Sequence, residues 1–144
     1  MENLIKWISL SGAVLAIILT ILKIVEILKN KPALVITYGS YCFDYVKGAT
    51  EITASFEITN VGTKPTTLKK YIIHLSDDKK KEVDFFGKRI YEANKKLSPS
   101  DYFEEWIVES VQRELANDKY YLRLDIITSH KSYVRFIELN KCMH

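Results

Sequence analysis

Residue types that carry chemistry are sparse in this 144-residue sequence, and their spacing assembles no familiar site. The histidines His74, His130 and His144 fall on a predicted strand, a turn and the C-terminus, whereas zinc needs three or four converging ligands. His74 alternates with apolar neighbours, so we expect its side chain on the solvent face of a strand. The spacing contains neither a nucleophile–histidine arrangement nor a glycine-rich phosphate loop. We therefore expect no catalytic, cofactor-binding or metal-binding residues and predict that the protein is not an enzyme.

Four carboxylates lie close together in the sequence, at Asp101, Glu104, Glu105 and Glu109. Carboxylates at this density could act as acid and base or hold a cation. The simpler interpretation is a solvated face that leads into a short helix over Glu109–Ala116, because the N-terminus of a helix favours negative charge.

Two cysteines, Cys42 and Cys142, lie in the first and last β segments. A disulfide can form between them if those segments are neighbours in the fold. Cytoplasmic thiols stay reduced, so a cytoplasmic domain would leave both cysteines free, and a bond between them would reverse the expected orientation.

A group of basic residues in the middle of the chain could contact anionic lipid, an acidic protein or a nucleotide if its members share one face. The group consists of Lys69, Lys70, Lys79, Lys80, Lys81, Lys88 and Arg89. Acidic residues are interspersed, so a solvated surface of mixed charge is the alternative. Residues 32–144 carry 17 basic and 16 acidic side chains, and this balance argues against a nucleic-acid polymer as partner.

The first element that positions these residues is an apolar N-terminal segment. Trp7–Leu22 contains no charged residue and would form about 24 Å of helix. Lys6 and Lys23 can extend their charges to the membrane interfaces, so Leu4–Leu28 is predicted as one helix across the lipid bilayer. Pro32 prevents the helix from continuing.

The charges around this segment predict its orientation. Lys23, Lys29 and Lys31 follow the span, and Lys6 precedes it. This excess favours a single-pass protein of the cell membrane whose C-terminal domain is cytoplasmic. A cleaved signal peptide is the alternative, but no small-residue cleavage site follows the apolar region.

Small residues recur on one side of the predicted helix, at Gly12, Ala16 and Thr20. This spacing lets two helices approach closely and could support a homo-oligomer in the membrane. Small residues that simply face lipid are the alternative. Together with Trp7 and Lys23, these positions are the candidate anchoring and helix-packing residues.

From Pro32 onward the pattern is that of β structure. In Glu51–Thr59 apolar residues alternate with polar ones, which predicts a strand with one buried face. Tyr120–Thr128 and Tyr133–Leu139 predict a C-terminal hairpin, and Glu82–Phe86 a short strand. Turn signals recur about every ten residues. They favour an antiparallel β-sandwich of immunoglobulin or fibronectin type with one short helix, or alternatively a small barrel.

The predicted domains are thus a membrane helix over residues 1–31 and a β domain over residues 32–144. In the predicted short helix, Val111 and Leu115 would face the core of the β domain. Lys88–Lys96 shows no clear pattern.

This order of features resembles that of small uncharacterised prokaryotic or phage proteins with an N-terminal transmembrane helix and an immunoglobulin-like domain. The matching segments are ILKNKPALVI at 27–36, FEITNVGTKPTTL at 56–68, LSPSD at 97–101 and the terminal hairpin. The resemblance implies that the turn with Asn60, Gly62 and Pro65 joins two early strands. It implies no reaction, since fold does not determine function.

We therefore expect a non-enzymatic, membrane-anchored interaction module that binds a protein partner through its β domain, by pairing at an edge strand. The first alternative is a membrane effector or sensor that binds a small anionic ligand through the basic group and oligomerises to perturb the bilayer. The second alternative is an extracytoplasmic domain of a surface assembly, which needs the opposite orientation.

Overall fold

The computed structural model describes residues 2–77, 81, 88–112 and 114–142. The chain divides into two compact units, Met1–Lys31 and Pro32–His144. The predicted strand over Glu82–Phe86 lies outside the described residues.

The first unit is one helix, α1 (Glu2–Lys29). Its segment Ser11–Lys29 is long and apolar enough to cross a membrane, and none of that segment is buried. The main-chain N–H of Asn30 donates to the Glu26 carbonyl at 2.9 Å, and Pro32, which has no N–H, follows two residues later. The prediction of one long apolar N-terminal helix is confirmed.

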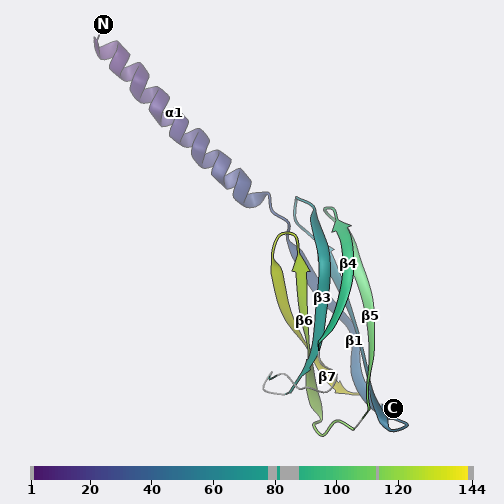
Figure 1. Ribbon diagram of the computed structural model, residues 1–144. Helices are drawn as coiled ribbons and strands as arrows, with labels where there is room; N and C mark the ends of the chain where they lie inside the picture. Colours follow the sequence, from purple (N-terminus) through teal and green to yellow (C-terminus); the bar gives the residue numbers. More distant parts are fainter. Residues whose placement is uncertain (1, 78–80, 82–87, 113, 143–144) are drawn as a thin grey trace. The chain divides into compact units, whose positions relative to one another are not determined.

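Seven strands make up the described part of the second unit (Figure 1). They are β1 (Leu34–Val46), β2 (Ala49–Asn60), β3 (Thr66–Ser76), β4 (Arg89–Leu97), β5 (Tyr102–Val111), β6 (Lys119–Thr128) and β7 (Ser132–Lys141). They form one sheet in the order β4-β3-β6-β7-β1-β2-β5. The prediction of a mainly β domain is confirmed.

The sheet is mixed, because β1 and β7 pair in parallel while the other neighbouring strands pair antiparallel. Strand direction reverses at each connection along the chain, so the odd-numbered strands all run the same way. Two odd-numbered strands that lie side by side must therefore be parallel. The expectation of an antiparallel sheet is wrong at this one pair.

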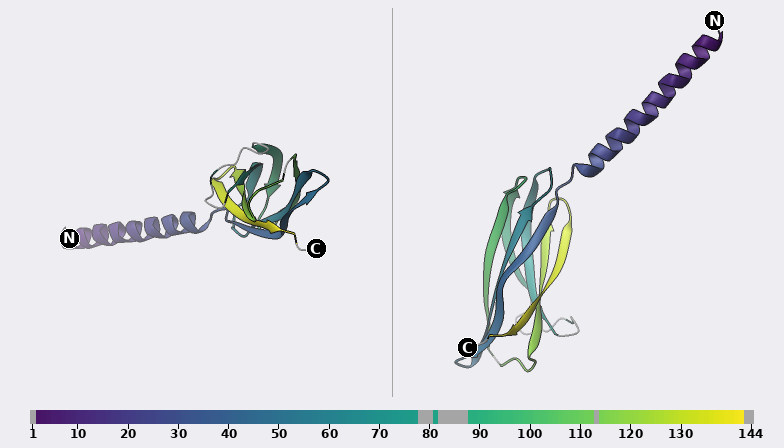
Figure 2. Two further views of the ribbon diagram at one scale, coloured as in Figure 1. Left: turned by 90° about the horizontal axis from the view of Figure 1, so that it is seen from below. Right: turned by 180° about the vertical axis from the view of Figure 1, so that it is seen from behind.

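The sheet curls on itself, so strands far apart in its order meet across the interior (Figure 2). Phe56 of β2 packs against Tyr71 of β3 with ring centroids 5.2 Å apart, and Phe103 of β5 lies 6.1 Å from the same tyrosine. The predicted inward face of β2 is confirmed, since Ile52, Ala54, Phe56 and Ile58 are all buried. Burial of this alternating apolar face drives the curl.

A buried asparagine ties the connection between β4 and β5 to the rest of the sheet. Asn60 is fully buried at the end of β2. Its amide Nδ2 donates to the carbonyls of Lys64 (2.9 Å) and Leu97 (3.0 Å), and its Oδ1 accepts from the Gly62 N–H (3.0 Å). Its main-chain N–H donates to the Asp101 carbonyl at 2.9 Å. The turn after β2, the end of β4 and the start of β5 are thereby fixed together.

The predicted helix over Glu109–Ala116 is wrong. The strand β5 continues to Val111, since β2 pairs with it as far as Thr50 opposite Val111, and no helix follows in the described residues up to Ala116. The ladder of hydrogen bonds to β2 outweighs the local helical pattern. Val111 and Leu115 are nevertheless buried, as predicted.

Two further segments differ from expectation. Lys88–Lys96, which had no clear pattern, supplies most of β4. His74 is only 2% exposed rather than on a solvent face, because its neighbours Ile73, Leu75 and Ser76 are buried as well and both faces of β3 are covered at this end.

Candidate functional site

The two edge strands of the sheet, β4 and β5, face each other across a cavity. They stand at opposite ends of the strand order and run antiparallel to each other. The cavity has a volume of about 630 Å³ and is lined by both strands, with Tyr71 of β3 contributing to it. We call the gap between β4 and β5, together with this cavity, the seam.

Side chains rather than a backbone ladder connect the two sides of the seam. The Tyr91 hydroxyl of β4 donates a hydrogen bond to the Glu109 carboxylate of β5. The Arg89 Nε lies 3.5 Å from Glu109 Oε2 and forms an ion pair with it. Among the described residues each edge strand has a sheet neighbour on one side only, so its other backbone edge, toward the seam, has no strand partner there.

Aromatic rings line the inner part of the seam. Tyr71 and Tyr91 stack with ring centroids 4.9 Å apart and an interplanar angle of 11°. Phe103 packs obliquely against Tyr71. These rings lie on β3, β4 and β5, so the inner part of the seam joins both edges of the sheet.

The tyrosine hydroxyls in the seam are paired with carboxylates. Burial raises the pKa of Tyr91 to about 12, and its hydrogen bond to the charged Glu109 contributes to the increase. Burial also raises the pKa of Tyr71 well above its usual range, and electrostatic repulsion by the nearby Glu105 carboxylate acts in the same direction. Each of these tyrosines therefore lies beside a carboxylate on the inward side of β5.

The outer rim of the seam is apolar and exposed. Ile90 of β4 is 58% exposed, and Trp106 and Val108 of β5 are 57% and 68% exposed. Tryptophan is strongly buried on average, so a Trp side chain this exposed on an edge strand is unusual. Exposed apolar side chains that are grouped together rather than scattered singly are typical of interaction surfaces.

The four carboxylates that are clustered in the sequence lie in different surroundings in the structure. Asp101 accepts a hydrogen bond from the Ser98 N–H at 2.9 Å in the turn before β5. Glu104 is exposed, whereas Glu105 and Glu109 lie on the inward side of the same strand. The expected helix N-terminus is absent from this stretch. The spacing of two from Ile107 through Glu109 to Val111 is the signal that could have shown that the strand over Tyr102–Val108 continues to Val111.

The basic group is spread over several elements. Lys69 and Lys70 lie on β3, Lys81 is exposed after β3, and Lys88 directly precedes Arg89 at the start of β4. Lys79 and Lys80 lie outside the described residues. Arg89 forms an ion pair with Glu109 in the seam.

The candidate packing residues of the helix lie on α1, which contains Trp7, Gly12, Ala16, Thr20 and Lys23. Space is open around Gly12, and the Thr20 hydroxyl donates to the Ala16 carbonyl at 2.8 Å. Within the described residues, histidine, cysteine and carboxylate side chains form no cluster that could hold a metal ion.

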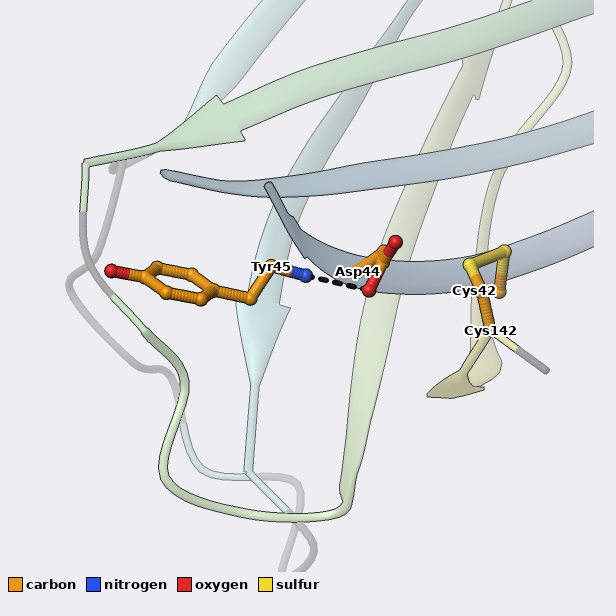
Figure 3. The surroundings of a disulfide bond; sticks show 4 residues. All are labelled: Cys42, Asp44, Tyr45 and Cys142. Carbon is orange, nitrogen blue, oxygen red and sulfur yellow. Dashed lines mark hydrogen bonds between the residues drawn. A yellow bond between two sulfur atoms is a disulfide. The ribbon is translucent and has the colours of Figure 1, made fainter. Parts of the chain in front are cut away.

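A disulfide joins β1 to the residue that directly follows β7 (Figure 3). Cys42 of β1 is bonded to Cys142, with Cα atoms 5.2 Å apart. The pairing of β1 with β7 brings the two cysteines together, and the Cys142 N–H also donates to the Phe43 carbonyl at 2.9 Å. The disulfide between Cys42 and Cys142, which the sequence allowed but did not predict, is therefore formed.

Comparisons with known proteins bear on the fold only. No protein-family model matches the chain, and no curated protein matches it in sequence. A Bordetella pertussis protein described as ApaA has a TM-score of 0.52 at 14% identity, over 79% of this chain and 96% of that one. A protein of Archaeoglobus fulgidus has a TM-score of 0.40 at 10% identity, over 79% and 100% of the two chains. The likeness to the Bordetella protein concerns the β fold, and the other is too distant to support any inference.

The Tyr–Glu pairs predict how stability changes at alkaline pH. The folded state favours protonated Tyr91, so this stabilisation is complete below pH 10 and is lost as the pH rises through about 12. We expect the Tyr91 contribution to the free energy of unfolding to fall by about 1–2 kcal/mol over this range, after allowance for solvent screening.

Urea denaturation of the full chain in mild detergent at pH 9, 10, 11 and 12 measures this contribution. Tyr91→Phe should flatten the decline, while the control Tyr45→Phe, at an exposed position, should keep the wild-type slope. Equal slopes in all three proteins would contradict the account of the seam.

Proposed function

We propose that this chain is a membrane-anchored interaction module without enzymatic activity, and that its β domain binds an extended segment of a protein partner along the seam. One observation carries the proposal: the unpaired edges of β4 and β5 face each other across a cavity with an exposed apolar rim.

The hydrogen-bonding capacity of a free strand edge supports this function. A free strand edge presents unpaired N–H and C=O groups, which a segment of another protein can satisfy by adding a strand. A strand residue occupies roughly 160 Å³ at ordinary sheet spacings, so the cavity has room for a segment of about four residues. Trp106 at the rim is of the residue type that most often dominates binding energy.

The strand order supports an immunoglobulin or fibronectin-like sandwich. One layer would hold β1, β2 and β5, and the other β4, β3, β6 and β7, with the parallel pairing of β1 and β7 as the junction. In such a sandwich β4 and β5 are edges of opposite layers, so the seam is the open side between the layers.

We propose that α1 spans the membrane and that the β domain lies on the non-cytoplasmic side. The lysines after the span favour the opposite orientation, but their excess over the N-terminal side is small. The disulfide favours an oxidising compartment, because thiols in the cytoplasm are kept reduced. Of these two indications of the orientation, the disulfide between cysteines 100 positions apart is stronger than the small excess of lysines.

Site-specific photocrosslinking tests the binding function. A benzophenone amino acid at Val108, on the rim of the seam, should crosslink a discrete protein in membranes of the source cells. The matched probe at Val134, an exposed valine of β7, should give no such product.

Adding Trp106→Ala to the Val108 probe should reduce the crosslinked product at least fivefold, because the substitution removes the main apolar contact of the rim. Crosslinks of equal yield at Val108 and Val134, insensitive to Trp106→Ala, would refute the proposed function.

Cysteine labelling in intact cells tests the orientation. Val61→Cys places a thiol at an exposed position of the β domain, and a membrane-impermeant maleimide should label it without permeabilisation. The Glu2→Cys control, before the span, should react only after permeabilisation. The reverse pattern, together with free thiols at Cys42 and Cys142, would show that the domain is cytoplasmic.

A further inference from the structure

We infer that the segment bound in the seam carries an arginine or lysine whose cationic group reaches Glu105. This inference rests on the proposed function and adds the chemistry of the partner. It follows from the difference between two carboxylates on the inward side of β5: Glu109 has a cation beside it, whereas Glu105 lines the cavity without one among the described residues.

The first pair already has its cation. Glu109 accepts a hydrogen bond from Tyr91 and forms an ion pair with Arg89, so a tyrosine, a carboxylate and a guanidinium are joined. The arrangement satisfies a carboxylate that is only 13% exposed.

The second pair repeats the tyrosine and the carboxylate without the cation. Glu105 lies near Tyr71, and both residues line the cavity. Within the part of the chain that the structure describes, Glu105 has no ion-pair partner, and the cavity lining contains Glu92 and Glu105 but neither lysine nor arginine. The negative lining favours a cationic group in this position.

The aromatic rings around Glu105 favour the same group. Tyr71 and Phe103 line the cavity beside this carboxylate. A guanidinium or ammonium group is attracted to aromatic faces, and its aliphatic stem packs against them. An anionic headgroup or an acidic segment would instead meet the two carboxylates of the lining.

The geometry of an added strand determines what lies on either side of the basic residue. Side chains alternate between the two faces of a strand, so the neighbours of an inward basic residue point outward. There they meet the apolar rim of Ile90, Trp106 and Val108. The predicted motif is therefore a basic residue between two apolar ones in an extended segment.

Two matched peptides test this inference on the full chain in lipid nanodiscs. The probe is the fluorescent, terminally blocked nonapeptide TVTVRVTVT, and its control replaces the central arginine by citrulline, which is neutral and nearly the same shape. Fluorescence anisotropy should show about tenfold tighter binding of the arginine peptide, the preference expected for one charge-assisted contact.

Substitutions assign that preference to one carboxylate. Glu105→Gln should abolish the difference between the peptides, whereas Glu104→Gln, one residue away on the exposed face of β5, should retain it. Trp106→Ala should weaken both peptides alike.

The outcomes separate this inference from the proposed function. Equal binding of both peptides that is still weakened by Trp106→Ala would overturn the basic-residue inference and leave the seam as a binding site. Binding of neither peptide, with self-association of the chain that Trp106→Ala abolishes, would assign the seam to a second copy and overturn the inference. Binding of neither peptide without self-association would count against both proposals.

Discussion

The junction between β1 and β7 joins the two halves of the sheet through a short parallel contact. Among the described residues, two pairs are in register there, Cys42 opposite Asn140 and Phe43 opposite Lys141. The disulfide reinforces this contact by closing a loop of 100 positions, which in the chain-entropy model stabilises the fold by about 4–5 kcal/mol. With β1 and β7 at the centre of the strand order, β4 and β5 are its two outer strands, and the curl brings their edges face to face.

Two sets of polar contacts then determine the form of the seam. At one end, the hydrogen bonds of Asn60 fix the connection between β4 and β5. Along the strands, Glu109 of β5 accepts a hydrogen bond from Tyr91 of β4 and forms an ion pair with Arg89 of β4. The edges are thus held close by side chains, while their backbone groups stay available. This combination gives a preformed site at little cost in conformational entropy on binding.

Local patterns in the sequence predict the parts of this fold that depend on nearby residues. The alternation in Glu51–Thr59 gives β2 and its buried face, and Lys47-Gly48, with φ of 52° and 88°, forms the tight turn between β1 and β2. The C-terminal hairpin is predicted for the same reason. Local patterns fail to predict the structure where residues distant in the sequence determine it. In β5, for example, pairing with β2 holds the last residues in an extended conformation. β4 has a mostly polar sequence because it is an edge strand with little buried surface.

The seam itself could not be predicted, because it depends on the order of strands in space. Nothing in the spacing of Tyr71, Tyr91 and Glu105 indicates that they come together. The sequence also left undecided whether Cys42 and Cys142 form a disulfide, because the pairing of β1 with β7 is what brings them together.

Amide hydrogen exchange of the full chain in nanodiscs tests most directly whether the seam is open. In an antiparallel edge strand, alternate amides bond to the single neighbour and the others point away. We expect alternate amides of β4 and β5 to exchange at rates close to those of exposed turns, while the amides in the middle of β6, which has neighbours on both sides, are protected. Uniform protection along both β4 and β5 would show that backbone hydrogen bonds close the seam, and would contradict the account.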